Sequence, residues 1–127
     1  MTGRCKAEFL RADLRSFGVA DPDANPVCNE LPSMHTPAVA FGCMYVMEGA
    51  TLGGQIISGH VARSFGYDAR HGAAFFHSYG NQTGAMWRKF GQSLAVFAAN
   101  PAVQDEIVAA AVSTFQSLQR WCESENT

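Results

Sequence analysis

Three glycines, Gly49, Gly53 and Gly54, interrupt a segment that otherwise reads as one long apolar helix. Each glycine inside a helix costs about 0.8–1 kcal/mol relative to alanine, so three cost about 2–3 kcal/mol. A cost of this size indicates that the backbone bends here or that another group approaches it closely. A neighbouring helix, a flat cofactor and a loop all remain open as explanations. A dinucleotide-binding loop is disfavoured, because the spacing is not G-x-G-x-x-G after a strand.

Histidines and basic residues are the other candidates for chemistry. The four histidines, His35, His60, His71 and His77, include no i, i+4 pair and no HExxH motif, so a multi-histidine metal site is not predicted. Each histidine is most simply interpreted as an ordinary surface or core residue. Haem iron, however, would need only one histidine ligand.

Arg88 and Lys89 directly follow Trp87 in a predicted helix. A solvated helix face is one reading of this pair. An anion clamp at the mouth of an apolar pocket, suited to carboxylates, is the other. The acidic residues predict neither a catalytic triad nor a paired-carboxylate site.

The composition predicts a single globular domain over residues 1–127. Hydrophobic residues make up 47% of the chain and charged residues 16%, which is enough to build a core. The net charge of -2, with scattered Lys and Arg, gives no nucleic-acid footprint. No run is long and apolar enough to span a membrane, and the N-terminus has no signal core, so we expect a cytoplasmic protein. The four widely spaced cysteines are expected to be reduced thiols rather than zinc ligands.

Periodicity and capping residues predict an all-α domain of four or five helices. The expected elements are a helix over 4–17, a loop over 19–35, a long helix from Thr36 to Gly66 that bends at the glycines, a short segment over 72–79, a helix capped by Thr83, and a last helix starting at Asn100. The first helix is expected to present Phe9, Leu10, Leu14 and Phe17 on one face, with Lys6, Asp13 and Arg15 elsewhere. The last helix carries an apolar stripe at Val108, Ala111, Phe115, Leu118 and Cys122.

Three segments, in this order and spacing, resemble the haem oxygenase family, in the bacterial branch often found with phytochromes. They are Tyr45-Val-Met-Glu-Gly-Ala-Thr-Leu-Gly-Gly-Gln55, Gly72-Ala-Ala-Phe-Phe-His-Ser-Tyr-Gly80 and Thr83-Gly-Ala-Met-Trp-Arg-Lys-Phe90. Residues 4–18 are similar to the Arg-rich helix that precedes this region in the branch. The resemblance covers roughly residues 4–120.

The resemblance implies an all-α fold that holds haem between a proximal and a distal helix. The glycine-rich helix would be distal, with Gly49, Gly53 and Gly54 as the catalytic positions whose backbone lies over the haem and leaves room for oxygen. The family opens haem with molecular oxygen and an external reductant, giving biliverdin, carbon monoxide and iron. An electron donor, and possibly a phytochrome that accepts biliverdin, are the implied partners besides haem.

The resemblance also implies the lining of the haem pocket. The expected haem-binding residues are Tyr45, Gly49, Gly53, Gly54, Phe76, Trp87 and Arg88, of which Arg88 matches a basic position for a propionate. Ala50 stands where animal enzymes have an aspartate, and the phytochrome-linked branch commonly has a small residue there.

The family's proximal histidine lies on a helix upstream of every matched segment, so we expect this chain to lack that helix and assign no iron ligand. An uncovered apolar groove would then favour a homo-oligomer. Two alternatives to a haem oxygenase remain open: a non-catalytic haem or tetrapyrrole binder of the same fold, and a helical interaction domain.

Overall fold

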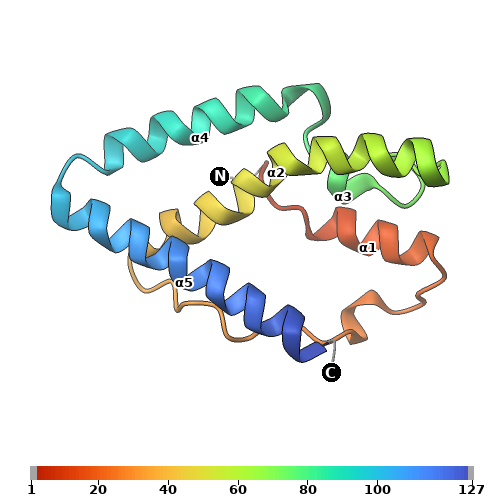
Figure 1. The fold of residues 1–127 in the computed structure, drawn as a ribbon, viewed down its shortest axis with the longest axis horizontal. Coiled ribbons are helices and arrows are strands. Elements are labelled where there is room, and N and C mark those ends of the chain that lie inside the picture. Colours follow the sequence, from red (N-terminus) through yellow and green to blue (C-terminus); the bar gives the residue numbers. More distant parts are fainter. Residues whose placement is uncertain (1–2, 126–127) are drawn as a thin grey trace. The chain divides into compact units, whose positions relative to one another are not determined.

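The computed structural model describes residues 3–125, and its regular elements are helices. The α-helices are α1 (Ala7–Ser16), α2 (Pro37–Phe65), α3 (Ala74–His77), α4 (Thr83–Phe97) and α5 (Pro101–Glu125), with single turns of 3₁₀-helix, η1 (Pro22–Ala24) and η2 (Gly80–Gln82) (Figure 1). Among the described residues the only β-type pairing is the isolated bridges of Asp68 with His71 and Gly72. The predicted all-α fold is confirmed.

Three of the predicted helix ends have the expected cap chemistry. The Thr36 hydroxyl accepts from the Val39 N–H at 3.2 Å, and Asn100 Oδ1 accepts from the Ala102 N–H at 2.9 Å. After α1, Gly18 adopts a φ of +87°, which a glycine reaches without steric cost. The prediction for Thr83 was wrong, because its hydroxyl donates to the Gly80 carbonyl at 2.8 Å instead of accepting from the N-terminus of α4.

The described chain forms two compact units. Unit 1 combines residues up to Pro26 with Ala50–Gly84, and unit 2 combines Val27–Gly49 with the residues from Ala85 onward. α2 therefore belongs to both units and passes from one to the other at Gly49–Ala50. The helix continues through the glycine cluster without interruption, while the bend expected there stays a prediction.

Unit 2 is organised by a close crossing of α2 and α5. A Cβ placed on Gly42 would lie 2.5 Å from the Ile107 carbonyl oxygen and 2.6 Å from the Ala110 Cβ. Only a glycine permits this approach. Next to the crossing, the buried Thr114 hydroxyl lies 3.2 Å from Cys43 Sγ and donates to the Ala110 carbonyl at 2.8 Å. Among the glycines described in this unit, the closest approach of another helix is therefore at Gly42, outside the Gly49–Gly54 cluster.

The face of α5 that is buried is not the one that its apolar stripe predicts. The buried side chains belong to Ile107, Ala110, Thr114 and Ser117. Val108 and Phe115, two members of the stripe, are 60% and 56% exposed. The close approach at Gly42 explains the difference, because small side chains fit into this crossing and large ones do not. α5 therefore presents apolar surface outward.

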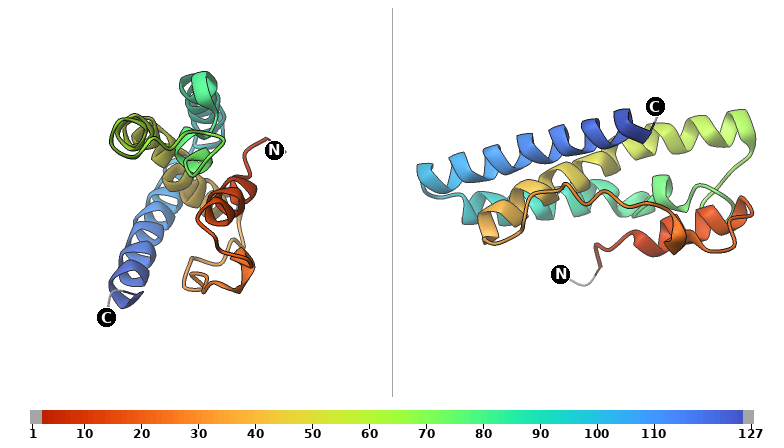
Figure 2. Two further views of the ribbon diagram at one scale, coloured as in Figure 1. Left: turned by 90° about the vertical axis from the view of Figure 1, so that its right-hand side faces the viewer. Right: turned by 90° about the horizontal axis from the view of Figure 1, so that it is seen from below.

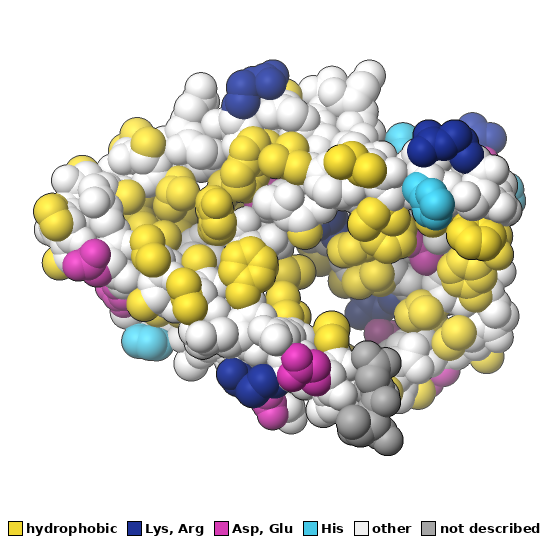
Figure 3. All heavy atoms as spheres, in the orientation of Figure 1, with side chains coloured by type: hydrophobic (Ala, Val, Ile, Leu, Met, Phe, Trp, Pro, Cys, Tyr) yellow, Lys and Arg dark blue, Asp and Glu magenta, His cyan; other side chains and the backbone are white. Residues whose placement is uncertain are grey.

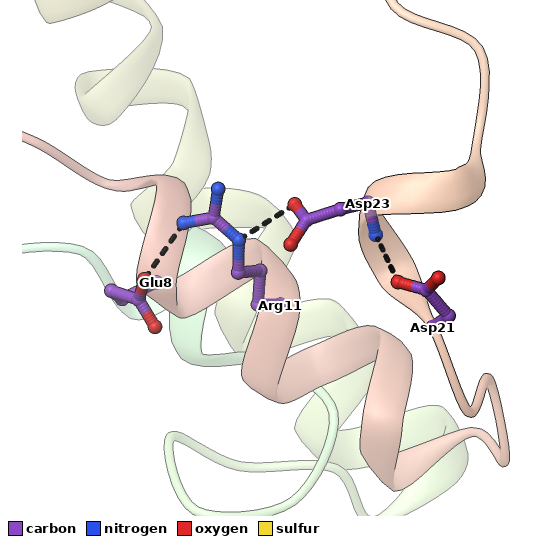
Figure 4. Close-up of polar contacts among 4 residues, drawn as sticks. All are labelled: Glu8, Arg11, Asp21 and Asp23. Atoms are coloured by element: carbon purple, nitrogen blue, oxygen red, sulfur yellow. Dashed lines mark hydrogen bonds and ion pairs between the residues drawn. The ribbon is translucent and has the colours of Figure 1, made fainter.

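In unit 1, α1 lies against α3 and against the η1 turn (Figures 1 and 2). On the side of η1, Arg11 donates to Asp23 at 2.9 Å and to Glu8 at 2.7 Å, as Figure 4 shows. Asp23 and Glu8 raise the pKa of the Arg11 guanidinium, first through the hydrogen bond to Asp23. The bridge ties the segment after α1 back onto the helix.

The far end of α1 packs on the loop after α2. The Phe17 and Tyr67 rings meet edge to face with centroids 5.1 Å apart. A Cβ on Gly72 would lie 2.9 Å from the Phe17 ring, so the loop can close only with glycine there. Asp68 shapes the same loop, because its Oδ1 accepts from the N–H groups of Arg70 at 2.8 Å and His71 at 3.0 Å.

The turn at Asp68 should loosen in acid. The Arg70 N–H, aided by His71, lowers the pKa of Asp68 below its ordinary value of 3.8. A depressed folded-state pKa means that this stabilisation is complete above pH 3.8 and is lost as the pH falls through the folded pKa. NMR titration of the Asp68 carboxyl carbon and of the Arg70 amide should give one shared midpoint below 3.8. A midpoint at or above that value would contradict the bonding, and Asp68→Ala should remove the amide's titration.

Within residues 3–125, every helix is too short or too polar to cross a lipid bilayer. The four cysteines, Cys5, Cys28, Cys43 and Cys122, are free thiols.

Candidate functional site

The predicted haem-binding residues divide between the two units. Tyr45, Gly49, Trp87 and Arg88 lie in unit 2, whereas Gly53, Gly54 and Phe76 lie in unit 1. Because α2 carries four of the seven, one helix supplies most of the candidate site.

In unit 2, three of these residues contact one another. The Trp87 ring of α4 lies over Gly49, and a Cβ on Gly49 would meet its Cη2 atom at 3.6 Å, an ordinary van der Waals distance. The Tyr45 ring packs on Trp87 with centroids 5.7 Å apart, and Phe90 stacks on the same ring at 5.7 Å. Tyr45, Trp87 and Phe90 therefore form a packed cluster of rings beside Gly49.

Arg88 follows Trp87 on α4 and is exposed to solvent, as is Lys89. Both cations are thus available to an anionic group at the surface of unit 2. Their role as a carboxylate clamp stays a prediction, for which exposure is a necessary condition.

In unit 1, Gly54 is covered by the backbone of α3. A Cβ on Gly54 would lie 3.0 Å from the carbonyl oxygen of Phe76, closer than nearly all real contacts of this kind. The neighbouring Gln55 donates from Nε2 to the His77 carbonyl at 3.1 Å. A glycine at position 54 therefore lets the backbone of α3 approach α2 closely, while the role of Phe76 in lining a haem pocket stays a prediction.

Gly53 differs from its neighbours because no heavy atom of the described residues beyond its own helix lies within 4 Å of its Cβ position. It has ordinary helical geometry, so neither packing nor backbone conformation calls for a glycine. An alanine here would be more favourable by about 1 kcal/mol. The open backbone at Gly53 is what a flat ligand lying on the helix would need.

Unit 2 also contains an apolar cavity of about 360 Å³ bounded by α2, α4 and α5. Its lining is Tyr45, Leu94, Ile107, Val108, Ala111, Val112 and Phe115, and it contains no charged side chain. Figure 3 shows hydrophobic side chains along the α5 face turned to the viewer. Tyr45 is the only residue of this lining among those expected from the sequence. The exposed α5 stripe supplies much of the rest.

Asp13 of unit 1 is buried, as Lys6 also is, although both were expected to lie away from the apolar face of their helix. Asp13 is only 8% exposed. Its neighbours at positions i−4, i−3 and i+4 are Phe9, Leu10 and Phe17, and this spacing was the signal that could have placed it. Its carboxylate binds the N-terminus of α3.

The described residues hold no group of three His, Cys, Asp or Glu side chains arranged to bind a metal ion. His77 contacts the glycine segment through its backbone, since its carbonyl accepts from Gln55. The ring of His77 packs against Gly80 instead.

A family model described as "Heme oxygenase" matches residues 19–124. The chain belongs to the haem oxygenase family. Comparison with curated proteins found no significant match, and neither did comparison with solved structures. As in other haem oxygenase family members, the matched range includes the three motif segments, of which the second contains α3 and the third begins α4. The all-α architecture agrees with this family.

Proposed function

We propose that this chain binds haem against the Gly49–Gly54 face of α2 and takes part in its oxygen-dependent cleavage to biliverdin, carbon monoxide and iron. The proposal is carried by the open backbone at Gly53 within a chain that matches the haem oxygenase family over residues 19–124. The same match runs through both compact units, which supports a single haem oxygenase-like domain over 1–127.

Each compact unit carries some of the features that one face of a haem would need. A porphyrin is flat and mainly apolar, so it needs a wall without projecting side chains and rings to pack against its edge. Gly53 supplies the open backbone, and Trp87 packs beside Gly49. The exposed guanidinium of Arg88 is suited to a propionate, because a guanidinium binds carboxylates in a bidentate manner.

Bound haem supplies the redox chemistry that opens its own ring, with molecular oxygen and an external reductant. The protein's residues orient the ring and exclude water. The same proposal includes an electron donor and a biliverdin acceptor such as a phytochrome, as in the bacterial branch that the sequence resembles. It also includes a location in the cytoplasm.

Haem titration tests the proposal. We expect a Soret band that saturates with a dissociation constant in the micromolar range or below. Adding a chemical reductant and oxygen should then replace this band with biliverdin absorption and release carbon monoxide. Saturable binding without turnover would favour the non-catalytic tetrapyrrole binder.

The absence of any spectral change would contradict the proposal and favour the helical interaction domain. The exposed apolar stripe of α5 is the observation that supports this alternative, since Val108 is 60% and Phe115 56% exposed. Surfaces of this kind mark association sites, and self-association of the chain is the expected form.

A further inference from the structure

Asp13 binds the start of α3 with both oxygens of its carboxylate. Oδ1 accepts from the Ala74 N–H at 2.7 Å, and Oδ2 accepts from the Phe75 N–H at 2.9 Å. The residue is 8% exposed, so these bonds are shielded from water. Hydrogen bonds to an ionised acceptor are shorter and stronger than neutral ones, and two of them from successive residues also define a direction. Asp13 therefore sets the position and orientation of the first turn of α3.

The other end of α3 rests on the glycine segment of α2. The Phe76 carbonyl is the group that would lie 3.0 Å from a Cβ on Gly54, and the His77 carbonyl accepts from Gln55 at 3.1 Å. α3 has four residues, too few to be stable without outside contacts. Its placement therefore depends on Asp13 at one end and on Gly54 and Gln55 at the other.

The turn that follows α3, at Ser78 and Tyr79, has a backbone conformation that needs support from neighbouring contacts. Ser78 has φ 52° and ψ −115°, and Tyr79 has φ −86° and ψ 5°, which are the dihedral angles of a type II′ turn. The first central position of this turn favours glycine, yet serine occupies it, and the buried Ser78 hydroxyl finds no hydrogen-bond partner among the described residues. Such a conformation persists only where neighbouring contacts over-determine it.

We infer that Asp13 is a positioning residue for the haem face of α2, acting through α3; this rests on the haem-binding function proposed above. The carboxylate holds the N-terminus of α3, and α3 in turn seats the Phe76 and His77 carbonyls on Gly54 and Gln55. Asp13 does not touch the ligand. Its loss releases α3 and changes the wall beside the open backbone of Gly53.

Hydrogen exchange of the haem-free protein tests the coupling directly. In Asp13→Ala, amides of residues 73–79 and of residues 50–57 should both exchange about tenfold faster. Asp13→Asn keeps one acceptor oxygen, so its amide exchange rates should lie between those of Asp13→Ala and of the unchanged protein. If Asp13→Ala does not fold, the exchange of Asp13→Asn decides the test. Arg11→Ala is the matched control: it removes the bridge to Asp23 from the same helix and should affect only residues near η1. Unchanged exchange at 50–57 in both Asp13 variants would overturn the inference.

The haem complex provides a second readout. At saturating haem, Asp13→Ala should shift the Soret maximum and weaken binding about fivefold, Asp13→Asn should recover part of both changes, and Arg11→Ala should match the unchanged protein. An unchanged spectrum and affinity in Asp13→Ala would overturn the inference while leaving haem binding intact. If the unchanged protein itself binds no haem, the proposed function fails, and the exchange experiment still decides whether Asp13 acts on α2 through α3.

Discussion

Gly53→Leu should weaken haem binding strongly while leaving the free protein at least as stable as before. The Cβ position of Gly53 meets no heavy atom of the described residues beyond its own helix within 4 Å, so the free protein can accept a side chain there. Leucine is also a far better helix former than glycine. A bound haem on this face would instead collide with the side chain. We expect a loss of affinity of at least about tenfold, equivalent to about 1.4 kcal/mol.

Gly53→Ala and Gly91→Ala separate the effect on the ligand from the effect on the fold. Gly91 lies in α4 and is equally free of neighbours, so both substitutions should raise the free energy of unfolding by about 1 kcal/mol. Only the substitution at position 53 should weaken haem binding. Urea unfolding and haem titration of the same preparations measure the two quantities. Haem affinity that survives Gly53→Leu unchanged would show that this segment is not the distal wall.

Gly42→Ala should have the opposite effect on stability. The added Cβ would lie 2.5 Å from the Ile107 carbonyl oxygen, 2.6 Å from the Ala110 Cβ and 2.9 Å from the Ala111 nitrogen. Two of these three atoms belong to the backbone of α5, so the helices must separate to admit it. Overpacking of this kind costs about 1–3 kcal/mol, and we expect the upper end of that range.

The measurement is urea unfolding followed by circular dichroism, with Gly53→Ala as control. The control makes the same substitution in the same helix, so its gain in helix propensity is equal, and the difference between the two variants reports the crossing alone. A Gly42→Ala protein as stable as the original would mean that α2 and α5 do not cross at Gly42 in solution.

Features that depend on neighbours along the chain were predictable. The N-caps at Thr36 and Asn100 and the left-handed glycine at Gly18 follow from short-range hydrogen bonding and sterics. The failure at Thr83 has a similarly local reason. η2 runs directly into α4, so the nearest acceptor for the Thr83 hydroxyl is the Gly80 carbonyl.

Burial was harder to predict, because it depends on the partner helix. In α5 the large apolar residues were expected to face inward, but the crossing at Gly42 is so close that Thr114 and Ser117 are buried instead. These hydroxyls find partners, since Ser117 donates to the Glu30 carbonyl at 2.9 Å. Asp13 is a similar case, because a buried carboxylate is favourable only where N–H groups meet it.

The helical class, the ends of most helices and the haem oxygenase family could all be predicted from the sequence, because caps, periodicity and motif order depend on residues close together along the chain. The sequence also located the unusual glycines, but it could not say why each is a glycine. The three-dimensional contacts were needed to show that Gly54 is covered by α3, that Gly49 faces Trp87, and that Gly53 is open. A glycine is needed where an atom of another segment occupies the space of a side chain, and for Gly49 and Gly54 those atoms belong to Trp87 and Phe76, which are more than twenty residues away in the sequence.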